Sequence, residues 1–347
     1  MNNTRPHTLW FLPLAAAACV AASSTYGQTV SAALRYGPDQ TIAGTIRIWG
    51  DENMSTVMKS WEEGFKKNHP DVNFETRLIG TAAAMPALYT GLADLAVMGR
   101  ESNAMDDNGF LHVLYYAPLR LDLMTGSLDV PGKSYALAIF VHKDNPTSRM
   151  TMAQLEAIFG CEHRRGLENI RTWGQLGLTG EWKDKPIHLY AYDAETGTGQ
   201  FFLHKALADS RKMNWEYLTE FRDIKNSDGS IRESGQQILD ALRKDRFGLA
   251  VSCARYATPA ARPVALGMQD GGPYYLATKE NLIARKYPLT RLTYAFVNRP
   301  PGKPTDPKVK EFLHYIFSRE GLEDVLRDGG YLPLSDEAVA EQLKKLD

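Results

Sequence analysis

Strand and helix patterns alternate along the chain from residue 45 to residue 98, and this order constrains the fold more than any other feature. Residues 45–50 (TIRIWG) and 72–79 (VNFETRLI) alternate polar and apolar side chains, as half-buried strands do. Between them, every fourth residue from Val57 to Phe65 is apolar, which predicts an amphipathic helix. An Ala-rich helix ending near Thr90 and an apolar strand after Asp94 continue the series. This alternation is typical of a largely parallel sheet in an α/β protein.

Loops between these strands and helices are the first candidates for a binding site. In open α/β sheets, ligands lie beyond the carboxyl ends of the strands, where loops lead into helix N-termini. Three such loops are expected at residues 50–56, where Asn53 or Ser55 can cap the helix, 80–84 and 98–102. A fourth follows the predicted strand 187–192.

The rest of the chain continues the α/β pattern. Strands are predicted at residues 136–141, 248–252, 287–298 and 331–334, and helices at residues 152–159, 238–242 and 309–317. A long loop carries Trp173 and Trp182, which form either a lid or partner surface, or pack against the second of the two lobes.

Residues 1–27 have the layout of a secretory signal. A polar start is followed by an apolar stretch at residues 9–22, too short to span a bilayer comfortably, and by small residues ending at Gly27. The alternatives are a membrane anchor, or a lipid attached at Cys19, for which no leucine stands three residues earlier. The mature protein is therefore expected to be periplasmic or secreted. There, Cys161 and Cys253 form one disulfide or remain two buried thiols.

The charge balance excludes one large class of partner. The chain has 40 Lys and Arg against 41 Asp and Glu, a net charge of −1, and no basic run longer than two residues. Removing the leader takes away only Arg5 and leaves 39 against 41. Such a chain lacks the broad positive field that nucleic acid requires, and nucleic acid is not expected as a partner.

Catalytic signatures are also missing from the sequence. It contains no Gly-x-Ser-x-Gly elbow, no His-Glu-x-x-His pair and no phosphate-binding P-loop. Cys161 and His163 have no second ligand pair at zinc spacing. We therefore expect no enzyme, no catalytic residue, no metal site and no cofactor.

Seven short segments, in order, resemble a known family. They are residues 80–81 (GT), 92–101 (LADLAVMGRE), 141–146 (VHKDNP), 155–159 (LEAIF), 196–202 (TGTGQFF), 287–291 (YPLTR) and 330–334 (GYLPL). Together they resemble the phosphate-binding proteins of bacterial ABC importers, which have the type II periplasmic binding protein fold, over roughly residues 44–335. The resemblance implies two α/β lobes joined by two hinge crossovers, with an oxyanion in the cleft. After the signal peptide at 1–27, lobe I is expected at 28–134 plus 266–347, and lobe II at 135–265.

The resemblance also implies the ligand-binding residues. The candidates from its three loops are Asn53, Met54, Ser55, Thr56, Gly80, Thr81, Ala82, Thr196, Gly197 and Thr198. Backbone N–H groups at a helix N-terminus, together with hydroxyls, bind an anion without adding formal charge, so these residue types suit the role.

Two positions depart from the family. Tyr192 stands where the family has an arginine, and Gly99 where it has a serine or aspartate. Asp193 and Glu195 add negative charge beside the loop. A dianion then needs another cation, such as Arg100 or Arg47, although Arg100 can equally pair with Glu101 or Asp106. Asp94 and Arg291 are interpreted as structural, with Arg291 in a salt bridge.

The leading hypothesis is a solute-binding protein for a small oxyanion, phosphate or an analogue, which it presents to ABC transporter membrane subunits or to a sensor. One alternative is an exported partner-binding or surface module that keeps the fold but has lost the ligand site. The other is a secreted phosphoester hydrolase that uses Asp51, Glu52, Asp193 and Glu195.

Overall fold

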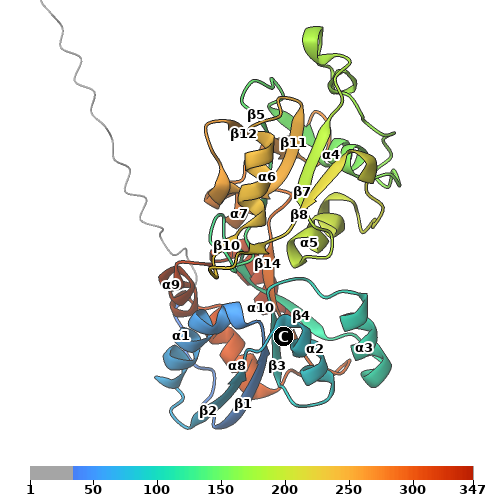
Figure 1. The fold of residues 1–347 in the computed structure, drawn as a ribbon. Helices are drawn as coiled ribbons and strands as arrows, with labels where there is room; N and C mark the ends of the chain where they lie inside the picture. The colour runs from blue at the N-terminus through green and yellow to red at the C-terminus, as the bar shows by residue number, and fades with distance from the viewer. Residues whose placement is uncertain (1–33, 347) are drawn as a thin grey trace, which may run out of the picture.

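The computed structural model describes residues 34–346, and the predicted signal peptide lies outside them. The chain forms two lobes, one above the other in Figure 1, each built on its own sheet. The first sheet has the order β2-β1-β3-β14-β4. Its strands are β1 (Gly44–Gly50), β2 (Val72–Arg77), β3 (Leu95–Met98), β4 (Leu119–Thr125) and β14 (Leu292–Val297). β1 pairs in parallel with β2 and β3, whereas β14 is antiparallel to β3 and β4.

Helices from both halves of the chain cover the first sheet. They are α1 (Ser55–Lys66), α2 (Thr81–Tyr89), α3 (Ala104–Leu114), α8 (Pro307–Ile316), α9 (Arg319–Asp328) and α10 (Asp336–Leu346). The helical face predicted from Val57 to Phe65 is fully buried. Its Trp61 donates its indole N–H to the carbonyl oxygen of Gly321 at 2.9 Å, which attaches α1 to α9. Segments from both ends of the described chain therefore build the first lobe.

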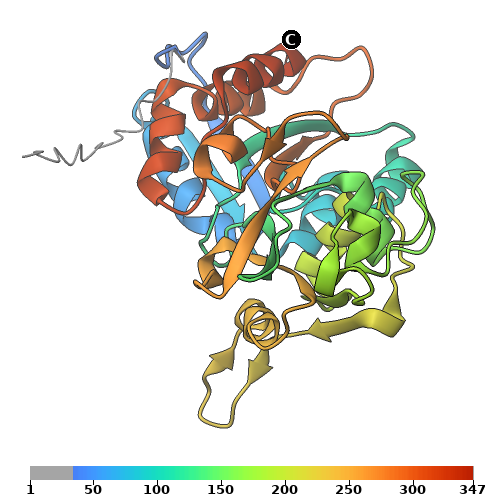
Figure 2. The same ribbon diagram turned by 90° about the horizontal axis from the view of Figure 1, so that it is seen from above.

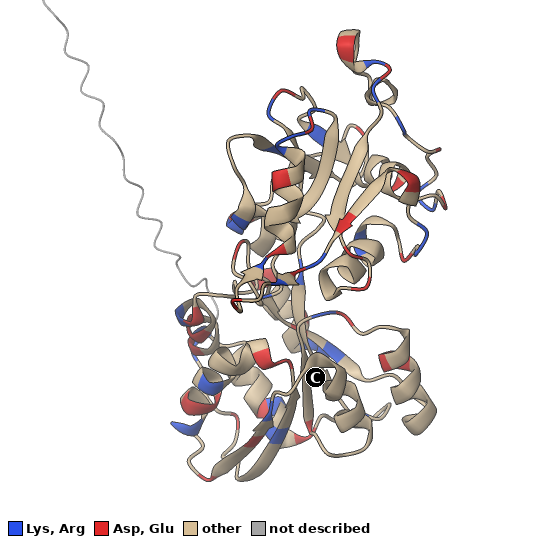
Figure 3. Cartoon of the chain, viewed as in Figure 1, with Lys and Arg blue, Asp and Glu red and all other residues tan. Residues whose placement is uncertain are grey.

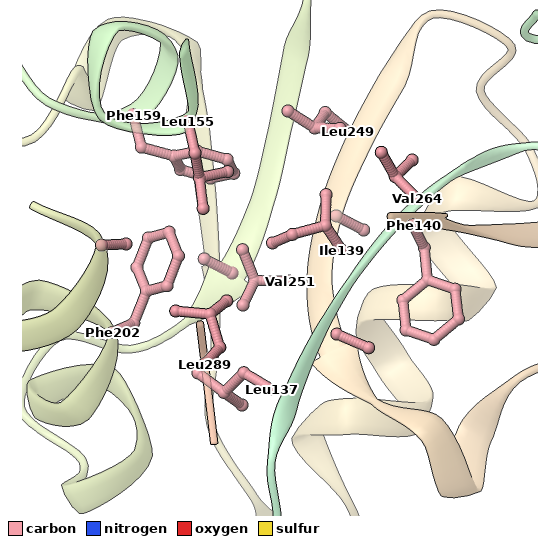
Figure 4. Packing of buried hydrophobic residues seen from close by; sticks show 14 of the residues in the cluster. Leu137, Ile139, Phe140, Leu155, Phe159, Phe202, Leu249, Val251, Val264 and Leu289 are labelled. Atoms are coloured by element: carbon pink, nitrogen blue, oxygen red, sulfur yellow. The ribbon is translucent and has the colours of Figure 1, made fainter. Parts of the chain in front are cut away.

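The second sheet has the order β13-β12-β5-β11-β7-β8, and β6 pairs with β12. Its strands are β5 (Leu137–His142), β6 (Arg149–Thr151), β7 (His188–Tyr192), β8 (Leu218–Phe221), β11 (Gly248–Cys253), β12 (Ala261–Gly267) and β13 (Tyr274–Tyr275). Its helices are α4 (Met152–Phe159), α5 (Gly197–Ala206), α6 (Ser234–Leu242) and α7 (Lys279–Ile283). In Figure 4, Phe159 of α4 and Phe202 of α5 point toward the strands, with ring centroids 5.1 Å apart.

Shorter elements complete the lobes. The two-residue strands β9 (Ile224–Lys225) and β10 (Ile231–Arg232) form a hairpin that projects from the second lobe in Figure 2. The 3₁₀ helices are η1 (Glu52–Met54), η2 (Trp173–Leu176), η3 (Gly180–Trp182), η4 (Trp215–Tyr217) and η5 (Ala254–Tyr256). Trp173 and Trp182 are both buried, with rings edge to face at 6.2 Å, so they pack into the second lobe and form no lid.

The two crossovers between the lobes run side by side. The first follows β4 and the second precedes β14, and the backbone N–H of Gly126 donates to the carbonyl oxygen of Arg291 at 2.8 Å. A Cβ at Gly126 would lie 2.0 Å from the carbonyl oxygen of Ser134. Only glycine allows the chain to approach this closely, so the predicted pair of hinge crossovers depends on this residue.

Three predicted boundaries are wrong. The lobe boundary at residue 265 falls inside β12, and α7 also packs in the second core through Leu282, so the second lobe extends past it. The strand predicted at 287–298 begins only at residue 292, because residues 287–291 are the crossover and Leu289 packs in the second core. The strand predicted at 331–334 is a single bridge between Thr125 and Leu332.

Two further sequence questions are answered by the structure. Cys161 and Cys253 are both free thiols, so no disulfide joins them. Within residues 34–346, no helix combines the length and the apolar character that crossing a membrane requires. In the view of Figure 3, acidic and basic residues are interspersed over both lobes.

Candidate functional site

Three loops meet at one edge of the first sheet, as the strand order predicts. They follow β1, β2 and β3, which are parallel neighbours, so their carboxyl ends lie side by side. The N–H of Gly80 donates to the carbonyl oxygen of Gly50 at 2.9 Å, and the N–H of Asp51 donates to that of Val97 at 3.1 Å. The loops are therefore fixed to one another through their backbones.

The first loop is shaped by Asp51. Its carboxylate accepts hydrogen bonds from the backbone N–H and the side-chain amide of Asn53, each at 3.0 Å. The prediction that Asn53 or Ser55 caps the helix is wrong, because α1 has no side-chain cap and Asp51 instead caps η1. The side chain of Met54 is buried in the core, which leaves only its backbone for a ligand.

Hydroxyl and amide groups remain available at the helix N-termini of this lobe. Ser55 and Thr56 open α1, are exposed, and make no side-chain hydrogen bond within residues 34–346. Thr81 and Ala82 open α2 directly after Gly80, whose φ of 126° needs a glycine. These groups suit an anion, because the first N–H groups of a helix have no partner within the helix.

The third loop shows why position 99 is a glycine. A Cβ at Gly99 would lie 2.0 Å from Oδ2 of Asp51, so the Asp51 carboxylate occupies the space that a side chain at this position needs. The carbonyl oxygen of Gly99 accepts a hydrogen bond from the Ser134 hydroxyl at 2.7 Å. Gly99 is buried and offers no side chain to a ligand.

The two cations considered from the sequence are already engaged. Arg100 donates to Oδ2 of Asp106 at 2.6 Å and to the carbonyl oxygen of Glu101 at 2.8 Å. Arg47 binds both carboxylate oxygens of Asp94, at 2.6 and 3.1 Å, which confirms the structural role of Asp94. Neither guanidinium has its charge free for a ligand.

The second lobe contributes the loop before α5. Thr196 is the N-cap of α5, and its hydroxyl accepts the N–H of Gly199 at 3.0 Å. Gly197 and Thr198 form the first turn, and the Thr198 hydroxyl makes no hydrogen bond within residues 34–346. A Cβ at Gly199 would lie 2.1 Å from the carbonyl oxygen of Asp193, so this glycine closes the turn.

Asp193 is neutralised locally. One of its carboxylate oxygens accepts the N–H of Glu195 at 2.8 Å, and the other binds the guanidinium of Arg222, from Nε at 2.8 Å. These two contacts lower the pKa of Asp193 below its usual value. Arg222 therefore compensates the charge of Asp193, but no ion pair within residues 34–346 compensates that of Glu195.

Tyr192 does not offer a cation, and its side chain lies in the second core. It is only 4% exposed, and its hydroxyl lies 3.5 Å from that of Ser252. Burial raises its pKa well above the usual value, so the hydroxyl stays neutral. The structure therefore places this predicted site residue beneath the loop of Thr196.

Helix α5 is bound to the first lobe through Glu101. This carboxylate accepts hydrogen bonds from Lys205 of α5 at 2.8 Å and from the Tyr294 hydroxyl at 2.9 Å, and it also pairs with His204. These contacts lower the pKa of Glu101 well below its usual range, although burial opposes the shift. They fix the last turn of α5 next to the segment that follows β3.

Sequence comparison identifies the family to which this architecture belongs. A family model described as a PBP superfamily domain matches residues 37–320. The chain belongs to the PBP superfamily. A relative named phosphate-binding protein PstS, from Pseudomonas aeruginosa, is 31% identical over 331 residues, which are 95% of this chain and 95% of that protein.

Solved structures share the fold of this PBP-superfamily protein. PstS from Borrelia burgdorferi matches with a TM-score of 0.57 and 15% identity, over 84% of this chain and 99% of that one. An ABC-type phosphate transport receptor from Vibrio cholerae matches with a TM-score of 0.50 and 17% identity, over 83% and 99% of the two chains. The predicted fold class, a type II periplasmic binding protein, is confirmed.

Sequence reasoning misses several residues of this PBP-superfamily site. It assigns Asp51 only a possible role as a hydrolase carboxylate, and it gives no sign of the contacts between Glu101 and α5. The interpretation of Arg291 as salt-bridged is wrong, because its guanidinium makes no ion pair with residues 34–346. Residues 287–291 contain no glycine and continue the pattern of the following strand. The sequence therefore gives no sign that Arg291 lies in the crossover.

One group in the described part of the chain has the spacing of metal ligands, and it lies outside these loops. Asp39, Glu311 and His314 bring one ligand atom each within 4.8 Å of one another. Glu311 already accepts hydrogen bonds from the Tyr36 hydroxyl at 2.7 Å and from the backbone N–H of Asp39 at 3.3 Å. Both donors bond to Oε1 of Glu311, which is the one buried carboxylate of these three residues.

Proposed function

We propose that this protein is a non-enzymatic solute-binding protein that holds phosphate, or a closely similar oxyanion, between its two lobes. The observation that supports the proposal is that α1 and α2 begin directly after loops at the carboxyl edge of the first sheet, while α5 of the second lobe lies with its Phe201 over the hinge residue Arg291. Each presents N–H donors and hydroxyls, which suit an oxyanion. The name of the Pseudomonas aeruginosa relative supports phosphate as the ligand.

The proposed binding residues are those that open these helices. The first lobe contributes Ser55, Thr56, Thr81 and Ala82, with the backbone of Asn53, Met54 and Gly80, and the second lobe contributes Thr196, Gly197 and Thr198. Closure of the lobes on the anion would replace water by fixed N–H and O–H donors. Contacts made to both lobes favour the closed state, because the ligand binds that state more tightly.

Transport is the proposed setting. A leader at residues 1–27 and the relatives of this chain favour a periplasmic protein that presents its ligand to the membrane subunits of an ABC transporter. The alternative of a partner-binding module with a lost ligand site predicts that no anion stabilises the protein. Hydrolysis gains no support, because the pKa of Asp193 is lowered and a general acid needs a raised one.

A ligand panel tests the proposal. The purified protein is unfolded and refolded in phosphate-free buffer to remove bound anions, and is then titrated with phosphate, sulfate, molybdate, a phosphonate and acetate. Phosphate at 100 times its Kd is expected to stabilise the protein by about 2.7 kcal/mol, visible as a rise of several degrees in Tm. If no anion changes the Tm or gives heat in calorimetry, the proposed function is wrong.

Two variants distinguish a role of the first loop in ligand binding from a role in stability. Ser55→Ala removes an exposed hydroxyl that has no partner within residues 34–346, so the Tm without ligand should not change while phosphate binding weakens. Ser60→Ala, on the same helix, removes a hydroxyl bonded to the carbonyl oxygen of Thr56 and serves as the control with unchanged affinity. If both variants bind phosphate as tightly as the wild type, Ser55 is not part of the binding site.

A further inference from the structure

Arg291 has an unusual position in the fold. It ends the second crossover, one residue before β14, and its backbone carbonyl bonds to Gly126 of the first crossover. The residue therefore lies at the hinge, where both lobes and both crossovers meet. A side chain here can contact groups of either lobe.

The surroundings of the Arg291 guanidinium come from both lobes. Its central carbon lies 5.0 Å from the centre of the Phe201 ring, in the second turn of α5. The charges and hydroxyls that act on it are Tyr135 in the first crossover, Tyr294, Asp51 in the loop after β1, and Tyr331. Arg291 thus contacts α5 of the second lobe through Phe201 and lies within electrostatic range of Asp51 in the first lobe.

Tyr135 interacts both with Arg291 and with Tyr192, which stands at the position where the family has an arginine. The hydroxyl of Tyr135 interacts with that of Tyr192, and the same residue acts on Arg291. Tyr135 is therefore a common neighbour of the side chain at position 192 and the Arg291 guanidinium. A cation reaching in from position 291 can occupy the region that an arginine at position 192 would serve.

The Arg291 guanidinium has all its donors available. It makes no hydrogen bond and no ion pair with residues 34–346, and its contact with Phe201 uses the charge but not the N–H groups. Burial lowers its pKa from the usual value, against the opposing effect of the neighbouring tyrosines and Asp51. Arg291 is partly buried. A partly desolvated cation without an ion-pair partner is unfavourable, and an anion placed beside it relieves this.

We propose that Arg291 is the cation of the oxyanion site, in place of the arginine that the family carries at position 192. The inference rests on the proposed function and adds a specificity-determining residue to it. A guanidinium offers five N–H donors in a planar fork and can bind two oxygens of one anion. In this arrangement Arg291 faces the oxyanion from the hinge, while the helix N-termini face it from the two lobes.

Phosphate titration of Arg291 variants tests the inference. We expect Arg291→Gln to weaken phosphate affinity at least about 30-fold, and Arg291→Lys, which keeps the charge but loses the fork, about five- to tenfold. Arg246→Gln is the matched control: Arg246 also lies over an aromatic ring, that of Trp182 at 5.5 Å, but pairs with Glu181 far along the second lobe. Its affinity should stay within twofold of wild type.

Thermal unfolding without ligand supplies the second measurement. Because the substitution removes no hydrogen bond or ion pair and only the contact with the Phe201 ring, the Tm of Arg291→Gln should stay close to that of wild type, and only its phosphate-induced rise should shrink. A lower Tm with unchanged phosphate affinity shows a structural residue and overturns the inference. If Arg291→Gln does not fold, Arg291→Lys decides, and wild-type affinity in that variant overturns the inference as well.

The failure of this inference is distinct from the failure of the proposed function. A wild-type protein that binds none of the anions in the panel overturns both. A wild-type protein that binds phosphate, together with variants that bind it equally well, overturns the role of Arg291 alone.

Discussion

Removing the charge of Glu101 should loosen the contact between the lobes. Glu101 follows β3 in the first lobe, and its partners His204 and Lys205 lie at the end of α5 in the second. The change Glu101→Gln keeps the shape of the side chain but leaves two cations of α5 without their shared carboxylate. We therefore expect the equilibrium between separated and closed lobes to move toward separation.

The size of the effect follows from the exposure of the partners. A hydrogen bond to a charged group contributes about 1.5–3 kcal/mol when it is well protected. The side chains of His204 and Lys205 are 42% and 35% exposed, so solvent screens both pairs and we reduce the total to about 1–2 kcal/mol. Since about 1.4 kcal/mol corresponds to a factor of ten, the closed population should fall about five- to thirtyfold relative to the open one.

The pH dependence of the wild-type contact has a definite sign. The hydrogen bond to Glu101, followed by that to Asp209, raises the pKa of His204 from 6.5 to about 9 against the effect of burial. This contribution is therefore fully present below pH 6.5 and is lost as the pH rises toward 9. The pKa of Glu101 is lowered from 4.5, so its contribution is present above pH 4.5 and is lost as the pH falls. The lobes should be held together most strongly between pH 4.5 and 6.5.

Small-angle X-ray scattering measures the separation directly through the radius of gyration. The wild type should expand between pH 6.5 and 9, whereas Glu101→Gln should be expanded throughout and respond little to pH. Glu63→Gln, which removes an exposed pair with Lys59 on α1, serves as the control that should behave as wild type. Identical scattering of Glu101→Gln and wild type from about pH 5 to 9 would refute the reasoning.

Three further changes have defined outcomes. Thr196→Ala removes the N-cap of α5, so it should lower the free energy of unfolding in urea by about 1 kcal/mol and also weaken phosphate binding. Thr151→Ala, which removes the N-cap of α4, is its control and should lower the free energy of unfolding by a similar amount without changing phosphate affinity. Gly99→Ala should lower the Tm, because its Cβ would lie 2.0 Å from a carboxylate oxygen, and an unchanged Tm would contradict this packing. Cys161 should react with a thiol reagent in the native protein, whereas Cys253, which is buried and whose pKa burial raises to about 11, should react only after unfolding.

The amino-acid sequence is sufficient for the features that depend on local pattern. Parallel strands at β1, β2 and β3 follow from alternating side chains, and their order places three loops at one edge of the sheet. The helix N-terminus at Thr196 is recognisable because a hydroxyl followed by glycines is a local capping signal. The loop that the second lobe contributes can therefore be located from local sequence alone.

Features that depend on tertiary contact cannot be predicted in the same way. The carboxylate of Asp51 fills the space beside Gly99, two positions 48 residues apart, and nothing in either local sequence indicates it. The apolar run at residues 287–298 has strand character throughout, but its first five residues are drawn into the crossover by Leu289 in the second core. Packing of this kind overrides local propensity.

The pairing of charges changes what the loops can select. Arg100 pairs with Asp106, Arg47 with Asp94, and Asp193 with Arg222, so none of these charges acts on a ligand at full strength. Arg291 then remains as a cation without an ion-pair partner in residues 34–346, together with the carboxylates of Asp51, Glu52 and Glu195. The carboxylates outnumber the cation, so attraction by net charge does not choose among oxyanions. Selection must instead depend on how well the N–H and O–H donors of the three helix N-termini, and the fork of Arg291, match the oxygens of the anion.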